Sequence, residues 1–284
     1  MKAIYDVPAP AKLNLFLHVT GQRADGYHLI QSVFMLIDWC DTLHFELRSD
    51  GLIARTDIGP AKTNILPTND LTVRAAQALK QACGTTSGVQ ISLDKRIPAE
   101  AGMGGGSSDA ASCLLALQRL WGVKLPHSEL LAIALSLGAD VPFFLFGGNA
   151  WVEGVGEQVA PVILPSADFL VMTPPLGVST PTIFASPALK RDTETATISG
   201  FATNSETRIF EFGHNDLQPV AQQFCPQIIQ SLDWLTRKQL RGRMTGTGSA
   251  VFAPLAHEVN ISDHPEGFVV RKCSNLQVHP LAGW

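Results

Sequence analysis

A glycine-rich segment holds the residues of this sequence that are best suited to chemistry. Residues 102–106 read Gly-Met-Gly-Gly-Gly, and Ser107-Ser108-Asp109 follow, ahead of a stretch rich in Ala and Leu that favours a helix. Glycine lets backbone N–H groups approach a ligand closely. The start of a helix, which a Ser or Asp of this segment is expected to cap, adds unpaired N–H donors and about half a positive charge. The segment therefore predicts an anion site, most naturally for phosphate.

The glycine spacing separates this segment from the commonest nucleotide-binding loops. A Walker loop ends in Gly-Lys-Ser/Thr, but no lysine follows Gly106. The dinucleotide fingerprint needs a third glycine where Ser107 stands, which argues against a dehydrogenase. A flexible surface turn is the alternative to a phosphate loop. A turn of that kind rarely joins a proline such as Pro98 to a capped, Ala-rich helix.

Two ionisable residues far away along the chain could act beside such a loop. Residues 11–19 alternate in the manner of a strand, which places Lys12 and Asn14 on the same face. Asp140 follows a predicted helix that ends near Gly138. Taken alone, Lys12 could be a charge that protects an edge strand, and Asp140 could be a helix cap. An ammonium and a carboxylate near bound phosphate would instead suit transfer of a phosphoryl group to an alcohol.

Composition narrows the class of protein and of partner. The 284 residues are 45% hydrophobic and 16% charged, which indicates a folded domain structure, and the net charge of -4 argues against nucleic acid as the main partner. The longest apolar run, 141–146, is too short to span a membrane. Five dispersed cysteines without metal-ligand spacing predict reduced thiols and a cytoplasmic location. A small-molecule substrate is therefore the expected partner, and a homodimer is left open.

The other predicted elements form an α+β pattern that positions these residues. A domain boundary is expected near residue 155, because glycines follow a predicted strand there, and the basic residues 237–243 are expected to be a solvated helix end. No element is expected in the Pro/Thr-rich loop 174–187 or in the polar stretch 190–206. The predicted helices are 70–82, 107–121, 128–138 and 219–237, and the predicted strands are 11–19, 31–37, 42–48, 89–93, 149–153, 169–172 and two near 250 and 269.

Three separated segments together resemble the motifs of the GHMP family of small-molecule kinases. They are Pro-Ala-Lys-Leu-Asn at 10–14, the loop 98–108 and Met-Thr-Gly-Thr-Gly-Ser at 244–249, and the resemblance covers essentially the whole chain. It implies a two-domain α+β GHMP kinase fold, with a ribosomal-protein-S5-domain-2-like N-terminal domain and a ferredoxin-like C-terminal domain. By this resemblance, residues 1–155 bind ATP and carry the catalytic groups, residues 156–284 bind substrate, and the active site lies between them.

The same resemblance implies roles for individual residues in ATP-dependent phosphoryl transfer with Mg²⁺. Lys12 would be the catalytic lysine and Asp140 the catalytic base, and the turn Gly246, Thr247 and Gly248 would support the phosphate loop. No residue stands out as the metal ligand, although Ser108 is a candidate. The ATP-binding residues would be Pro98, Ala99, Glu100, Ala101, Gly102, Met103, Gly104, Gly105, Gly106, Ser107 and Ser108.

Further segments narrow the resemblance to a branch whose acceptor is a cytidine diphosphate conjugate of methylerythritol. They are 10–15, 23–28 and 137–142. The resemblance implies that Tyr27 stacks on the cytosine, with Phe184 on the opposite side of the base and His28 hydrogen-bonded to it. Asn14 and Thr180 would make polar contacts to the substrate.

Two departures from the family pattern and two alternatives remain. Glu100 places a negative charge in the phosphate loop, where it is expected to point to solvent, and Asp70 stands near a position where asparagine is expected. The alternatives are another GHMP kinase, acting on a mevalonate derivative, homoserine or a sugar, and a nucleotide-binding relative without catalysis.

Overall fold

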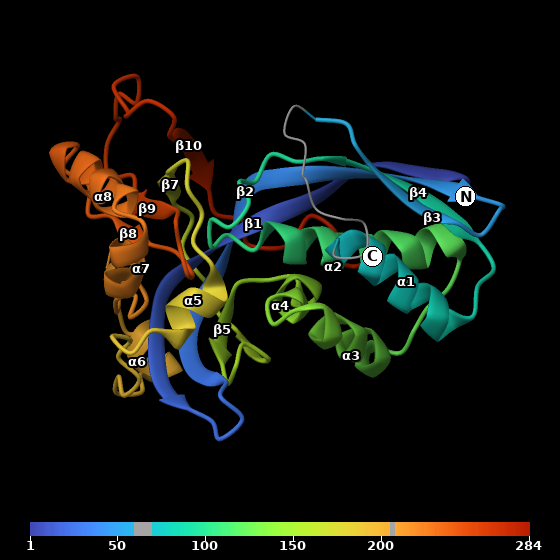
Figure 1. Ribbon diagram of the computed structural model, residues 1–284, viewed down its shortest axis with the longest axis horizontal. Coiled ribbons are helices and arrows are strands. Elements are labelled where there is room, and N and C mark those ends of the chain that lie inside the picture. The colour runs from blue at the N-terminus through green and yellow to red at the C-terminus, as the bar shows by residue number, and fades with distance from the viewer. Residues whose placement is uncertain (60–69, 205–207) are drawn as a thin grey trace.

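Two long paired strands form the centre of the protein, whose computed structural model describes residues 1–59, 70–204 and 208–284 (Figure 1). Strands β1 (Ala3–Gln22) and β2 (His28–Arg48) are antiparallel, with Lys12 opposite Leu36. The strands predicted at 31–37 and 42–48 are both part of β2, because polar residues between them interrupt the apolar pattern but not the pairing. Both faces of β1 are buried around Leu13 and Phe16, so its polar residues lie inside the protein.

The first sheet has the order β3-β4-β2-β5-β6, with β1 paired to β2. Two of its members, β3 and β6, were not predicted, and β6 pairs with β5 and extends the sheet past residue 155. A division of the chain near 155 therefore remains a proposal. The remaining strands of this sheet are β3 (Ile53–Asp57), β4 (Gly88–Asp94), β5 (Ala150–Glu153) and β6 (Gln158–Pro161).

Four helices accompany this sheet, and α2 begins at the glycine loop (Figure 1). Leu114 and Leu117 of α2 share a core with Phe45 and Ile91 of the sheet, which holds the start of α2 in place. The expectation that a Ser or Asp caps this helix is wrong: Gly104 is the N-cap, with no side-chain cap, and Ser107 lies inside the helix. The helices are α1 (Leu71–Cys83), α2 (Gly105–Trp121), α3 (His127–Leu137) and α4 (Val141–Phe146).

The second half of the chain builds an antiparallel sheet of order β10-β7-β9-β8, with helices packed beside it (Figure 1). The helix predicted at 219–237 is divided at Pro226, because proline lacks an N–H and restricts the residue before it. The strands are β7 (Asp168–Thr173), β8 (Arg243–Met244), β9 (Val251–Pro254) and β10 (Val269–Ser274). The helices are α5 (Thr180–Ala185), α6 (Ile198–Ala202), α7 (Gln218–Phe224), α8 (Gln227–Arg237) and a 3₁₀ turn at Ile209–Glu211.

Three further expectations are corrected in this half. The loop 174–187 contains α5, and the stretch 190–206 contains α6; both helices are too short to show a period in the sequence. Arg243 is not solvated, since its Nη1 donates to the carbonyl oxygens of Leu15 and Phe212 at 2.6 Å each. Burial accordingly lowers the pKa of Arg243 to about 10.

The C-terminal segment returns to the first sheet and its helices. The N–H of Leu276 donates to the Leu36 carbonyl at 2.8 Å, and the N–H of His279 donates to the Gly147 carbonyl at 2.9 Å. Trp284 lies against the Arg119 guanidinium on α2, 4.3 Å from ring centroid to Cζ. The C-terminal segment is therefore joined to the first half of the chain both by backbone hydrogen bonds and by a side-chain contact. Within the described residues, no helix is long and apolar enough to cross a membrane.

Candidate active site

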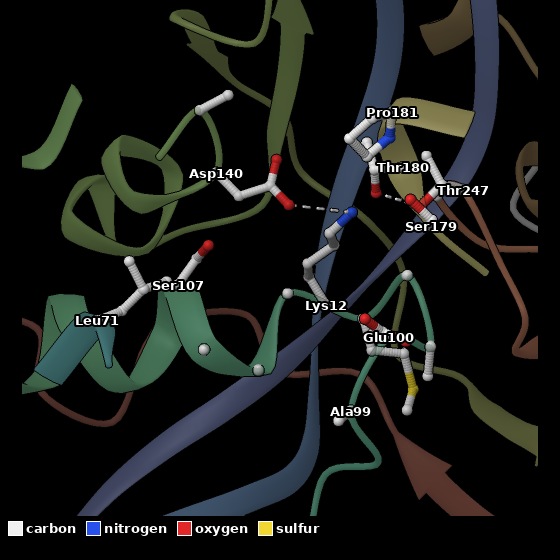
Figure 2. Close-up of a pocket in the computed structure, with 18 of the residues that line it drawn as sticks. Lys12, Leu71, Ala99, Glu100, Ser107, Asp140, Ser179, Thr180, Pro181 and Thr247 are labelled. Carbon is white, nitrogen blue, oxygen red and sulfur yellow. Dashed lines mark hydrogen bonds and ion pairs between the residues drawn. The ribbon is translucent and has the colours of Figure 1, made fainter. Parts of the chain in front are cut away.

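A cavity of about 1160 Å³ lies where the two halves meet (Figure 2). Its wall includes the β1–β2 turn, the glycine loop, the starts of α1 and α5 and the turn after β8. Nearly all of the predicted site residues line it, and the two that do not are Ser108 and Gly248. Ser108 is fully buried in the first turn of α2, and Gly248 packs against Met244.

The backbone of the glycine loop is arranged to receive an anion. Gly102 and Gly104 have φ values of 73° and 69°, in the left-handed region that side chains disfavour. The first intrahelical bond joins the N–H of Ser108 to the Gly104 carbonyl at 2.9 Å. The N–H groups of residues 104–107 have no hydrogen-bond acceptor among the residues that the structure describes. With no capping side chain in the way, these donors and the helix dipole face the cavity together.

Lys12 and Asp140 meet inside this cavity, although 128 positions separate them in the sequence (140 − 12). The Lys12 Nζ lies 3.5 Å from Asp140 Oδ2, and Figure 2 shows the two side chains reaching toward each other above the start of α2. Lys12 is 3% exposed, and its Nζ also donates to Asn14 Oδ1 at 2.5 Å. Burial lowers the pKa of Lys12, and the Asp140 carboxylate opposes this shift. Asn14 therefore helps to orient the lysine.

The side chain of Asp140 lines the cavity and does not cap a helix. It occupies the position before α4, yet its carboxylate makes no capping hydrogen bond. Val141 and Phe143 behind it are fully buried in the core, which fixes the start of α4. The carboxylate is about one-third exposed, at 31%, on the cavity side. This geometry disfavours the cap interpretation of Asp140.

The turn after β8 packs directly against the glycine loop. A Cβ added to Gly246 would lie 2.6 Å from the Gly102 carbonyl oxygen, so the two backbones touch. The N–H of Ala250 donates to the Ala101 carbonyl at 3.2 Å. Thr247 Oγ1 lies 3.0 Å from Thr180 Oγ1 on α5, a contact drawn in Figure 2. The second half of the chain thus holds the loop from outside, as expected for a supporting turn.

The predicted base-binding residues line the same cavity. Tyr27 is 64% exposed in the β1–β2 turn, so its ring is available to a ligand. The rings of His28 and Phe184 lie 5.0 Å apart, and both line the cavity. The structure therefore brings Tyr27, His28, Phe184 and Thr180 into one cavity with Lys12 and Asp140.

The two residues that depart from the family pattern have separate explanations. Glu100 is exposed at a φ of 52° and also lines the cavity, so the expectation that its carboxylate points to solvent stays a prediction. Asp70 caps α1, accepting hydrogen bonds from the N–H groups of Thr72 and Val73 at 2.9 and 3.1 Å. Asp70 therefore has a structural role of its own.

A buried ionic cluster beneath the glycine loop was not predicted from the sequence. Lys95 Nζ donates to Asp109 Oδ2 at 2.7 Å and also to the carboxylate of Asp41. Asp41 in turn accepts from the N–H groups of Arg96 and Ile97, at the entry to the loop. Burial raises the pKa of Asp109 to about 7, although Lys95 acts in the opposite direction. A charged residue inside the Ala-rich stretch after the glycines was the one signal that could have indicated this cluster.

Comparison with known proteins places the chain in a family. The family model described as the GHMP kinases N terminal domain matches residues 70–148. A 4-diphosphocytidyl-2-C-methyl-D-erythritol kinase of Polaromonas sp. (strain JS666) is 68% identical over 293 residues, covering 100% of this chain and 95% of its own. A crystal structure of a 4-(cytidine 5'-diphospho)-2C-methyl-D-erythritol kinase has 33% identity and a TM-score of 0.76, covering 94% of this chain and 98% of that one.

A more distant structure shows how far the fold extends. Homoserine kinase from Cytophaga hutchinsonii has 14% identity and a TM-score of 0.72, covering 98% of this chain and 96% of that one. Since that enzyme shares the fold at such low identity, the fold alone does not select the acceptor. The likeness to the solved kinase structure confirms the predicted two-domain α+β fold. The high sequence identity over the full length of the chain selects the branch of the family. The chain belongs to the 4-diphosphocytidyl-2-C-methyl-D-erythritol kinases, within the GHMP kinase family.

Proposed function

We propose that this enzyme transfers the γ-phosphate of ATP to the 2-hydroxyl of 4-(cytidine 5'-diphospho)-2-C-methyl-D-erythritol, in the non-mevalonate (MEP) pathway to isoprenoid precursors. One observation carries the proposal: the Lys12–Asp140 pair stands in the same cavity as a loop of free N–H donors. The relatives named for this reaction support the choice of acceptor. Phosphoryl transfer depends mainly on positioning and charge stabilisation, which this arrangement offers.

The reaction can be followed atom by atom. The acceptor oxygen forms a bond to the γ-phosphorus of ATP while the bond from that phosphorus to the bridging oxygen breaks, and ADP leaves with those electrons. The hydroxyl proton passes to the Asp140 carboxylate. The Lys12 ammonium stabilises negative charge that develops on the acceptor oxygen, and loop N–H groups at 104–107 hold the phosphates.

Magnesium fits the oxygen atoms near the loop. Asp109 lines the cavity, and its Oδ1 has no hydrogen-bond partner in the part of the chain that the structure describes. Ser108, the candidate ligand from the sequence, is fully buried and does not line the cavity. Mg²⁺ prefers oxygen ligands and is usually held by one or two side chains together with substrate phosphates. We propose that Asp109, which lines the cavity, would hold Mg²⁺ together with the phosphates, and that the metal would neutralise phosphate charge.

A direct assay tests the function. Pure protein is incubated with ATP, Mg²⁺ and the cytidine diphosphate methylerythritol acceptor, and the new phosphate is located by ³¹P NMR. The expected product carries a phosphomonoester on the tertiary carbon. Homoserine, mevalonate and galactose serve as competing acceptors, and faster ADP release with one of them would replace the proposal. ATP binding without ADP release on any acceptor would favour the non-catalytic alternative.

Lys12→Met should lower kcat by about 10²–10³-fold, the typical loss when one charge-stabilising donor is removed. ATP affinity should change little, because the phosphates are held chiefly by the loop backbone. The effect is measured by steady-state kinetics and by ATP titration calorimetry. Lys124→Met removes an exposed lysine of the same charge and provides the control. A kcat equal to that of the control would exclude a catalytic role for Lys12.

Tyr27→Ala should raise the KM for the cytidine acceptor by about 5–150-fold, which corresponds to about 1–3 kcal/mol of stacking. The KM for ATP should stay the same, because Tyr27 is not part of the glycine loop. The matched control is Tyr5→Ala, since Tyr5 is the other of the two tyrosines and lies at the start of β1. An unchanged acceptor KM would refute the stacking role.

We further propose that the enzyme acts in the cytoplasm on small molecules alone. The five cysteines are free in the structure, as expected for reduced thiols. A homodimer stays a prediction, which light scattering of the pure protein would test.

A further inference from the structure

Arg191 lies behind the proposed base-binding end of the cavity, and sequence reasoning did not identify it. Its Nε donates to His28 Nε2 at 2.9 Å. Its Nη2 donates to the carbonyl oxygens of Phe184 and Ser186 at 3.1 and 2.8 Å, and its Nη1 donates to the Leu189 carbonyl at 2.9 Å. One guanidinium therefore contacts the side chain of His28 and the backbone that carries the facing ring of Phe184.

The chain on either side of Arg191 is fixed in place. The N–H of Thr193 donates to the Val19 carbonyl at 3.1 Å. The side-chain amide of Gln31 on β2 forms two hydrogen bonds to the backbone of Ala196, at 2.8 and 3.1 Å. Within residues 1–59, 70–204 and 208–284, no carboxylate pairs with Arg191 to draw it elsewhere. The position of its Nε relative to His28 is therefore set by the fold.

The contact decides which ring nitrogen of His28 carries the proton. Arginine has only donors, so His28 Nε2 must accept and cannot carry a hydrogen. In the neutral ring, the proton then sits on Nδ1. Burial, and next the charge of Arg191, lower the pKa of His28, which keeps the ring neutral near pH 7. Nδ1 has no hydrogen-bond partner among the residues that the structure describes, and His28 lines the cavity. The ring thus offers one fixed donor to a ligand.

We propose that Arg191 is a specificity-determining positioning residue: it holds His28 as the Nδ1–H tautomer, so that the base site accepts cytosine and rejects uracil. The inference rests on the proposed function, because it takes a cytidine diphosphate acceptor as the ligand. It goes beyond that function by assigning base discrimination to a residue that does not itself contact the base.

Cytosine and uracil differ at N3, a position where a fixed hydrogen-bond donor would distinguish them. On its pairing edge cytosine presents N3 as an acceptor, whereas uracil presents N3–H as a donor. An Nδ1–H group that faces this position makes a hydrogen bond with cytosine and meets a second donor with uracil. A well-placed contact to a base edge is worth about 1–3 kcal/mol of discrimination, and an unpaired buried donor adds to the penalty. Without Arg191, the ring can change tautomer and accept the uracil N3–H.

The test compares Arg191→Met and Arg191→Lys with Lys190→Met, which removes a neighbouring exposed charge. The tautomer of His28 is determined in each free protein from the ¹⁵N NMR shifts of its ring, assigned with His28→Gln. The kcat/KM is measured for the cytidine diphosphate acceptor and for its uridine diphosphate counterpart. The wild type and Lys190→Met should show the Nδ1–H form and a preference for cytidine of roughly tenfold or more.

The expected result for Arg191→Met is loss of the single Nδ1–H form, together with a fall of about tenfold in the cytidine-over-uridine ratio. Arg191→Lys keeps a donor and should retain part of both properties. A purely structural role would lower both rates together without changing the tautomer or the ratio, and would overturn the proposal. So would an Nε2–H tautomer in the wild type. If the wild type fails to phosphorylate the cytidine acceptor, the proposed function fails, while the NMR result still decides whether Arg191 sets the tautomer.

Discussion

Asp140→Ala should reduce kcat by about 10²–10⁴-fold, the contribution usual for a positioned general base. The alanine leaves no carboxylate to take the proton of the acceptor hydroxyl, while Lys12 and the loop N–H groups stay in place. ATP should still bind with nearly wild-type affinity, because the donors at 104–107 belong to the backbone. The loss should therefore be seen in kcat and not in the dissociation constant for ATP.

The experiment pairs single-turnover kinetics with calorimetric titration of ATP. Asp140→Asn keeps the size of the side chain but cannot accept the proton, so its rate should fall nearly as far as that of the alanine variant. Asp233→Asn, on the exposed side of α8, controls for the loss of an acidic residue. An Asp140→Asn enzyme with wild-type turnover would exclude proton transfer to this residue. Loss of ATP binding in both Asp140 variants would show that the carboxylate acts earlier, in forming the nucleotide site.

The parts of the site that sequence reasoning placed correctly depend on local rules. The glycines at 102–106 could be recognised because glycine at a helix start exposes N–H groups regardless of the rest of the fold. The projection of Lys12 and Asn14 from the same face follows from the period of a strand, and their side chains do meet. Local periodicity alone could not show that Asp140 would reach Lys12 across 128 positions. The resemblance to the kinases supplied that pairing, and the ion pair at 3.5 Å agrees with it.

The parts that sequence reasoning missed depend on tertiary contacts. Strand β2 continues through Asp38 and Asp41, which look like a break in the apolar pattern of the sequence. The strand persists because its pairing with β1 and β4 stabilises the extended backbone there. Arg191 lies in a polar stretch with no period, so only the folded chain reveals its contact with His28. The cluster of Lys95, Asp41 and Asp109 joins the segment after β4, a strand and a helix, and no spacing rule connects these three positions.

Lys95→Met should have the largest effect on stability, a loss of about 3–5 kcal/mol in the free energy of unfolding, because it leaves buried carboxylates without their cation. Lys95 is 11% exposed, and Asp41 and Asp109 are 0% and 4% exposed, so water would replace the ammonium poorly. The change should also loosen the glycine loop, since Asp41 accepts hydrogen bonds from the N–H groups of Arg96 and Ile97. Urea unfolding followed by circular dichroism measures the stability. The expected effect on kinetics is a raised KM for ATP.

A double variant and a change of pH separate the ionic effect from simple loss of packing. Lys95→Met with Asp109→Asn removes one of the stranded charges and should recover part of the lost stability. Burial raises the folded pKa of Asp109 from 3.8 to about 7, so the stability tied to its protonated form is present at low pH and is lost as the pH rises toward 7. Without Lys95, which acts to lower that pKa, the protonated form is favoured further, and the destabilisation should be greater at pH 8 than at pH 5. Equal losses at both pH values, with no recovery in the double variant, would mean that Lys95 supports the loop by packing alone and not by its charge.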